Sequence, residues 1–459
     1  MKFISSGFIT LSCLFCSLVY SSPLWAQTNN NNIYSRFGLG ALESPVNPQQ
    51  LGMGGTGVAS AGQHGINLLN PAALAFTPMT TFQAAGAGMT VKYKYQDAST
   101  NFNGGYLKNV FLGFRKPGGK WGFALGMQPY SFVNYSASSN ITLNDSVSTT
   151  YTYEGQGSLN KATMGMARKF YFGGNEEENR QKQTLSIGLH TNYIFGTIQH
   201  ASKVGFPEQT NYNYGKFSQN HFLNGFQWEA GLLYILPIKH TLDVNKKVIQ
   251  HSDLHVGLSF GLAARLRAES TYLDEILTAS SLIDFPVDTT YMNESIRFNY
   301  TIPQQITAGL AWSYYKQKLG DVQINVEYSM QDWSGSKINL GSDISGSNSL
   351  TRSERLSMGL AYTPDNSVNT GTMRHCTYRL GYYTGQTYWK INAKNVTESA
   401  ITAGISIPVL KSLNKINLGA SYYRLGQASE RLLEMTGFVY QVGVTLVPRE
   451  SWFLRRKYE

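Results

Sequence analysis

A serine between two glycines is the first feature of this sequence whose residue types and spacing could support catalysis. Residues 257–261, Gly-Leu-Ser-Phe-Gly, match the G-x-S-x-G motif of serine hydrolases. That motif works on a sharp turn between a strand and a helix, where the serine hydroxyl is exposed. Here it lies inside an alternating segment that continues to Arg267, so we interpret the glycines as small residues of a strand. A hydrolase is the alternative that the motif leaves open.

A second glycine motif, at residues 52–57, matches the G-x-G-x-x-G spacing of dinucleotide-binding sites. Such a site needs a strand before the motif, a helix after it and an acidic residue about 20 positions further on. Residues 48–50 are Pro-Gln-Gln, and no Asp or Glu occurs between Glu43 and Asp97. We therefore expect no nucleotide cofactor.

Histidines and cysteines give no stronger signal. His251 and His255 are four residues apart, which is a metal-binding spacing on a helix but not on a strand. Cys13 and Cys16 form a C-x-x-C pair in a segment that we expect to be removed, which leaves Cys376 alone. The sequence thus predicts no disulfide framework, no metal site and no cofactor.

The first 26 residues have the pattern of a secretory signal peptide. Lys2 is followed by an apolar run at residues 8–20, and the small residue Ala26 is suited to cleavage before Gln27. No later run reaches about 18 apolar residues, so no transmembrane helix is expected. Any membrane crossing must use strands.

The composition favours such a wall of strands. Of the 459 residues, 14% are charged and 13% are aromatic, whereas average soluble domains have about 25% charged residues. Few charges and many Tyr, Gly, Ser, Thr and Asn residues suit a wall with one face toward lipid and the other toward a polar lumen. The net charge of +10 comes from dispersed Lys and Arg residues, so we expect no nucleic-acid partner.

Apolar and polar residues alternate along most of the chain after Thr80, as at residues 321–332 and 436–447. The pattern predicts 14 strands, near residues 80–95, 106–116, 120–136, 155–171, 183–200, 218–236, 252–270, 303–316, 320–333, 352–363, 375–385, 396–407, 414–425 and 434–447. The predicted fold class is all-β: a 14-stranded antiparallel transmembrane outer-membrane β-barrel. A soluble β-sandwich array is the alternative.

The connections alternate between long and short, as expected for a barrel with both termini in the periplasm. We predict outer loops near residues 96–105, 137–154, 201–217, 271–302, 334–351, 386–395 and 426–433. Four regions are expected: a signal peptide at 1–26, an N-terminal hatch inside the barrel at 27–79, the barrel at 80–447 and a periplasmic tail at 448–459.

The hatch is predicted from residues 47–76, which are rich in Gly, Ala and Asn and poor in charge. Two Asn-Pro pairs favour turns or extended backbone at each Asn, and small residues allow compact packing inside a wall. We expect the hatch and its gating to depend on Asn47, Pro48, Gly54, Gly55, Asn70, Pro71 and Ala72.

Alternation also predicts which charged side chains point into the lumen: Arg265, Arg267, Glu327 and Arg379. A charge on the lipid face would cost several kcal/mol near the midplane. We expect these groups to pair with one another or with the hatch rather than with a substrate. Pro129 interrupts the third strand, so a bulge near Gln128, Pro129 and Tyr130 is a candidate lateral opening.

Several of these segments resemble the FadL-type outer-membrane hydrophobic-compound transporters. The resemblance rests on residues 70–75 (NPAALA), 128–131 (QPYS), 302–310 (IPQQITAGL), 326–328 (VEY) and 332–334 (DWS), while residues 34–38 and 452–457 look like a Bacteroidetes branch. It implies a non-enzymatic channel that passively admits apolar compounds such as long-chain fatty acids, with hatch gating and lateral release at the third strand. Its partners would be outer-membrane lipid and an apolar ligand.

Members of the same broad family also act as non-catalytic subunits of type IX secretion. The alternative function is therefore a protein-binding barrel with a secretion or surface protein as its partner. An unbroken apolar lining would favour transport, whereas a sealed lumen would favour binding.

Overall fold

The computed structural model describes residues 32–61, 65–95, 98–116, 118–143, 147–173, 182–205, 213–242, 248–279, 284–336, 349–364, 372–409, 413–427 and 432–448. The expected signal peptide and nearly all of the expected C-terminal tail lie outside these residues. No helix in the described part of the chain is long and apolar enough to span a membrane.

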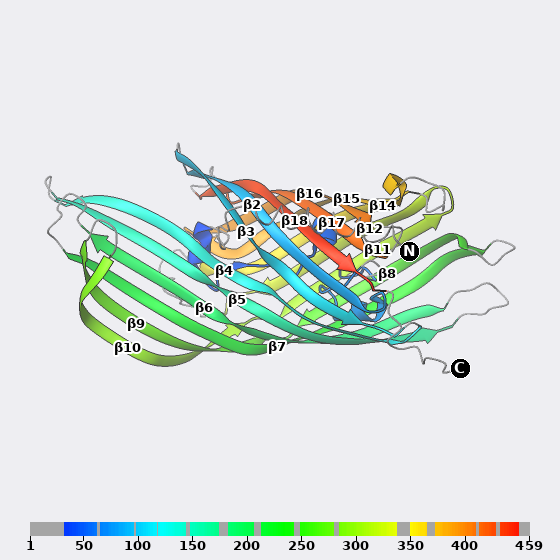
Figure 1. Cartoon of the computed structure of the whole chain (residues 1–459), viewed down its shortest axis with the longest axis horizontal. Coiled ribbons are helices and arrows are strands. Elements are labelled where there is room, and N and C mark those ends of the chain that lie inside the picture. The colour runs from blue at the N-terminus through cyan, green and yellow to red at the C-terminus, as the bar shows by residue number, and fades with distance from the viewer. Residues whose placement is uncertain are drawn as a thin grey trace, which may run out of the picture.

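The wall is a closed antiparallel barrel of 14 strands, which confirms the predicted fold class (Figure 1). The strand segments are β2 (Thr81–Tyr95), β3 (Ala98–Phe114), β4 (Trp121–Leu143), β5 (Val147–Phe172), β6 (Gln183–Gly205), β7 (Asn213–Leu242), β8 (Val248–Gly261), β9 (Ala264–Ala279), β10 (Asp284–Ile302), β11 (Gln305–Lys316), β12 (Gly320–Asp332), β13 (Ser349–Leu350), β14 (Arg352–Thr363), β15 (Thr377–Ile391), β16 (Lys394–Pro408), β17 (Lys415–Leu425) and β18 (Glu434–Leu446).

Three wall strands are interrupted, so that β8 with β9, β10 with β11, and β13 with β14 each serve as one strand. The ladder between β18 and β2, with Leu446 opposite Phe82, closes the barrel.

Alternation explains the strands: Val326 is 40% exposed on the lipid side, whereas its neighbour Glu327 is 8% exposed and points inward. The outward apolar band is the surface that meets lipid.

One side of the barrel is much taller than the other. β7 has 30 residues and β5 has 26, whereas β17 has 11, and β9 and β10 reach far to the left in Figure 1. The predicted outer loops at 137–154, 201–217 and 271–302 were therefore largely wrong, because most of these residues continue the wall as strands. Their Ser, Thr and Asn residues lack the alternation of a lipid-facing segment, so the sequence pattern predicted loops there.

The N-terminal segment lies within the wall, where Figure 1 shows its blue ribbon. Its elements are η1 (Ile33–Arg36), β1 (Ala41–Leu42), α2 (Pro48–Leu51) and η2 (Pro71–Phe76). Each Asn-Pro pair starts a helix: the Asn has extended backbone and caps the first turn, and the Pro takes the first helical position. The two Asn residues thus adopt the extended conformation that the sequence predicted.

Candidate functional site

The N-terminal segment has two parts with different supports. We call residues 32–46 the strap, and residues 47–61 with 65–76 the hatch core. The hatch core contains α2 and η2 and touches many wall strands, whereas the strap runs along β4 and reaches β3 through Glu43. The candidate site comprises both parts, the seam between β3 and β4, and the cavity that the strap and the hatch core enclose with the wall.

Wall glycines hold the hatch core by close backbone contact. A Cβ atom added to any of these glycines would lie 2.1–3.0 Å from an atom of the hatch core, closer than packing permits. Eight wall strands contribute one such residue each, and we call the set the glycine belt: Gly122, Gly188, Gly231, Gly257, Gly359, Gly381, Gly404 and Gly419. Gly257, the first glycine of the G-x-S-x-G motif, thus has a structural role, because it lies against the carbonyl oxygen of Val58.

Polar wall side chains add directed bonds at the turn after α2. The Glu327 carboxylate accepts hydrogen bonds from the backbone N–H groups of Gly57 and Val58, at 2.8 and 2.9 Å. Gly54 donates to Thr402 Oγ1 at 2.9 Å and accepts from Arg355 Nη2 at 3.3 Å. Gly54 and Gly55 have φ of 69° and 80°, which a residue with a side chain rarely adopts.

Asn70 fixes the second turn of the hatch core. Its amide nitrogen donates to the carbonyl oxygens of Leu232 at 2.9 Å and Val58 at 2.7 Å, and its amide oxygen accepts from Ala72 N–H at 3.0 Å. Ser186 on β6 donates to the carbonyl oxygen of Ala72 at 2.7 Å. Asn47, Pro48, Pro71 and Ala72 are all buried within this packed region.

Two of the four charges predicted to face the lumen do so. Glu327 contacts the hatch core, and buried Arg379 donates to Ser406 Oγ at 2.6 Å. The prediction was wrong for Arg265 and Arg267, which are exposed on the face opposite Leu266. The reason is the break between β8 and β9 at residues 262–263, which exchanges the inner and outer faces of the following strand.

The seam between β3 and β4 is where the wall ladder stops. Among the described residues, these strands pair only where Val110–Phe114 face Phe123–Met127. Beyond this point each strand carries a bulge, because the pairing skips Lys108 in β3 and Tyr130 in β4. The bulge predicted near Gln128, Pro129 and Tyr130 is confirmed.

The strap covers the open part of the seam. β1 pairs with β4, with Ala41 opposite Phe132 and Leu42 opposite Ser131. Backbone N–H groups of the strap also donate to β4, from Asn32 to the Asn134 oxygen and from Glu43 to the Tyr130 oxygen, both at 2.8 Å. The strap therefore stands where the neighbouring wall strand would otherwise be.

Glu43 joins the strap to β3, the strand on the other side of the seam. Its carboxylate forms an ion pair with Lys108 Nζ and accepts a hydrogen bond from Tyr106 Oη at 3.0 Å. Lys108 also donates to the carbonyl oxygen of Ser44 at 2.6 Å. The bulge turns Lys108 inward, and its side chain is 2% exposed against 16% for Glu43. Glu43 thus contacts both β3 and β4, the two strands that border the seam.

Sequence reasoning missed this pair. Glu43 is the last acidic residue before Asp97, within a segment expected to be buried. A buried charge needs a partner, and this signal could have marked Glu43. Nothing in the sequence identified Lys108 as the partner, because the bulge that directs it inward leaves no local pattern.

Aromatic residues cover the strap on the outer side. The rings of Tyr34 and Trp389 stack with centroids 5.7 Å apart, and Trp389 Nε1 donates to the Phe37 oxygen at 3.2 Å. Tyr388 donates to the oxygen of Gly40. Burial raises the pKa of the Tyr34 phenol well above its ordinary value, so it stays neutral. These groups belong to a large apolar cluster in the outer half of the lumen, with Leu159, Ile194, Ile198, Leu223, Leu266 and Ile302.

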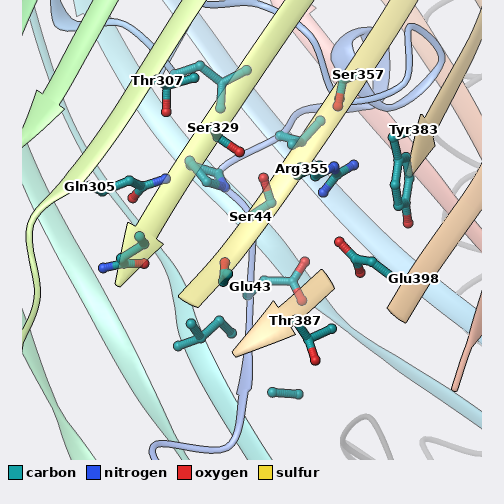
Figure 2. A pocket seen from close by; sticks show the side chains of 18 of the residues that line it. Glu43, Ser44, Gln305, Thr307, Ser329, Arg355, Ser357, Tyr383, Thr387 and Glu398 are labelled. Carbon is teal, nitrogen blue, oxygen red and sulfur yellow. The ribbon is translucent and has the colours of Figure 1, made fainter. Parts of the chain in front are cut away.

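A cavity of about 380 Å³ lies between the strap and the hatch core. Figure 2 shows Glu43 and Ser44 between Gln305 and Thr307 on one side and Tyr383 and Glu398 on the other. Most of the residues that line it are polar, but apolar residues also line it, among them Leu42, Met89, Leu425 and Val439. The lumen is therefore not lined by an unbroken apolar surface. In the described part of the chain, no three His, Cys, Asp or Glu residues are placed to hold a metal ion.

The closed wall, the internal hatch and the interrupted seam define a hatch-plugged transmembrane barrel, a class that bacteria place in the outer membrane. The chain matches the BamG family over residues 8–459 and belongs to that family. None of the curated proteins compared matches it.

Solved structures with a similar fold are hydrophobic-compound channels. The *Ralstonia pickettii* toluene transporter TbuX has a TM-score of 0.52 and 15% identity, covering 88% of this chain and 98% of its own. The CymD monoaromatic hydrocarbon channel has a TM-score of 0.50 and 13% identity, covering 88% and 98%. A *Pseudomonas aeruginosa* FadL homologue has a TM-score of 0.50 and 14% identity, covering 89% and 99%. These matches confirm the FadL-type fold; the Bacteroidetes branch stays a prediction.

Proposed function

We propose that the protein is an outer-membrane channel for the passive uptake of small hydrophobic compounds such as long-chain fatty acids. The observation that supports this best is the seam: the outer parts of β3 and β4 are covered by the strap and not by each other. Release of the strap would open the wall sideways toward lipid. The similar folds named above, a toluene transporter and a monoaromatic hydrocarbon channel, agree with this class of solute.

The proposed route avoids the polar part of the lumen. An apolar solute enters the apolar cluster in the outer half, displaces the strap and leaves through the seam into the bilayer. It does not cross the glycine belt, where the hatch core and the wall are in backbone contact. We therefore assign gating to the strap and a fixed supporting role to the hatch core.

A reversible disulfide across the strap tests this route. Ala41 and Phe132 face each other in the β1–β4 pairing, so Ala41→Cys with Phe132→Cys, in a Cys376→Ser background, should lock the strap. Cells carrying the oxidised protein should lose at least about 90% of their uptake of labelled long-chain fatty acid. A reductant should restore it.

A second disulfide provides the matched control. Ala403 and Ala420 face each other on the exposed surface of β16 and β17, away from the seam. Oxidation of Ala403→Cys with Ala420→Cys should leave uptake unchanged. Equal uptake by the locked and reduced strap variants would overturn lateral release, whereas loss of uptake in both pairs would show only that oxidation damages the cells.

A protein-binding barrel is the second candidate function. It is favoured by the polar cavity and by the acidic outer end of the tall side. Residues 269–296 contain six acidic residues and no Lys or Arg, although the chain as a whole is basic. A secretion or surface protein with a basic segment would fit this end. Copurification of such a partner, together with uptake equal to that of cells without the protein, would select this function.

A further inference from the structure

The Glu43–Lys108 ion pair ties the strap to the wall. It is nearly enclosed, so its attraction is weakly screened by solvent. The hatch core does not depend on it. Any group that replaced Glu43 at Lys108 would therefore loosen the strap and leave the hatch core on its belt.

The surroundings of this pair match an amphipathic ligand. Lys108 Nζ and Tyr106 Oη supply two hydrogen-bond donors at one point of the cavity. Leu42, Met89 and Val439 line the same cavity, and Met89 and Val439 face each other across β2 and β18. Donors at one point and apolar side chains beside them suit a carboxylate with a hydrocarbon chain.

We propose that Lys108 and Tyr106 bind the carboxylate of an amphipathic monocarboxylate, which displaces Glu43 and thereby releases the strap. The inference rests on the proposed lateral release and names the ligand group and the trigger. Two carboxylates at one buried ammonium repel each other, so binding of the ligand and retention of Glu43 compete. Uptake is then opened by the compound to be carried.

The other cations of the cavity do not offer this trigger. Lys161 bonds to Glu229, at 3.2 Å, and both residues belong to the wall. Arg355 bonds to the hatch core through the oxygen of Gly54 and stacks over the ring of Tyr383 at 3.5 Å. A carboxylate at either residue would leave the strap in place.

Competition predicts a particular pattern of affinities. Dodecanoate and dodecanol have the same chain, and only dodecanoate carries the carboxylate. With purified full-length protein in lipid nanodiscs, Glu43→Gln should bind dodecanoate about tenfold more tightly than the natural protein, because the competing charge is gone. Dodecanol binding should change less than twofold. Glu398→Gln, which removes a carboxylate from the same cavity but not from the strap, should change neither.

Removal of the Lys108 ammonium should change dodecanoate affinity in the opposite direction. Lys108→Gln should weaken dodecanoate binding about tenfold, and Lys108→Arg should retain most of it. Lys108→Arg keeps the test valid if Lys108→Gln fails to form a heat-modifiable barrel on gels. Equal dodecanoate affinity in the natural protein and Glu43→Gln, or an equal gain for dodecanol, would overturn the proposal.

Strap position is a separate measurement. Spin labels on Ser44→Cys and Ser138→Cys, in the Cys376→Ser background, should move apart when dodecanoate is added and stay in place with dodecanol. A carboxylate-dependent movement without any uptake would leave the inference standing and overturn lateral transport. Binding without movement would overturn the inference while leaving transport to be judged by the disulfide experiment.

Discussion

The strap and the hatch core are both buried, both largely irregular and both part of one N-terminal segment, yet they are held in different ways. The hatch core meets glycines from eight wall strands by direct backbone contact. The strap is held by two paired residues of β1, a few backbone bonds, the Glu43 ion pair and hydrogen bonds from Tyr388 and Trp389. Burial alone therefore does not show which part of a plug can move.

The wall explains the difference. Around the hatch core the ladders are continuous, and glycines on neighbouring strands lie directly opposite one another, as Gly359 does to Gly381 and Gly188 to Gly231. At the strap the ladder has ended and two bulges separate the strands. The part that we propose to be fixed lies where the wall is complete, and the part that we propose to be released lies where it is not.

The largest expected effect comes from filling the glycine belt. A Cβ at Gly381 would lie 2.1 Å from the nitrogen of Gly54, and neither backbone can retreat because both are held by further contacts. We expect Gly381→Val to destabilise the barrel by more than about 3 kcal/mol. The heat-modifiable band on gels should be lost.

Gly215 on β7 is the control, because no atom lies within 4 Å of its added Cβ. Gly215→Val should retain the folded band, with a stability change within about 1 kcal/mol. A stable, folded Gly381→Val barrel would break the comparison, since it would show that the hatch core can shift.

The wall of this barrel could be predicted where its chemistry is regular. Strands β12, β14, β16, β17 and β18 agree with the alternation to within about two residues at each end, because lipid on one side and the lumen on the other impose a period of two. β10 could not be predicted in this way. It has three register shifts and Pro286, so its pattern resembles a loop.

Asn70→Ala should give the next largest effect. The change leaves the oxygens of Leu232 and Val58 without their donor in a buried region, which costs on the order of 2 kcal/mol. Denaturant titration followed on gels should show the loss. Fatty-acid uptake per folded molecule should stay within about twofold, because Asn70 supports the fixed part. A large change in uptake with unchanged stability would reverse the roles assigned to the two parts.

Tyr388→Phe is the corresponding test for the strap, because it also removes one buried hydrogen bond. It removes one hydrogen bond to the oxygen of Gly40 and keeps the ring against Trp389. Loss of about 1 kcal/mol from strap binding should raise uptake about fivefold, since each 1.4 kcal/mol is a factor of ten. The midpoint of denaturant unfolding should not move. A stability loss without an uptake gain would show that the strap is as fixed as the hatch core.

The site was predictable in part for the same physical reasons. Asn47, Asn70 and Pro129 act through local backbone rules, so the sequence identified them. Glu327 followed from alternation. The orientation of Arg265 and Arg267 could not be predicted from alternation, because the break after β8 reverses the faces. The Glu43–Lys108 pair could not be predicted either, because the contact joins positions 65 residues apart. Contacts across the lumen depend on closure of the whole wall.

Pro129→Ala carries the smallest expected effect. Pro129 follows closely after the last paired residue of the seam, Met127, and it has no N–H to donate to a ladder. Alanine supplies that donor and can extend the β3–β4 ladder slightly, while the bulge at Tyr130 and the bond from Glu43 persist. Uptake of labelled fatty acid should fall about twofold, and stability should rise by less than about 1 kcal/mol. If uptake rises instead, the end of the ladder does not limit release, and the strap alone determines how far the seam opens.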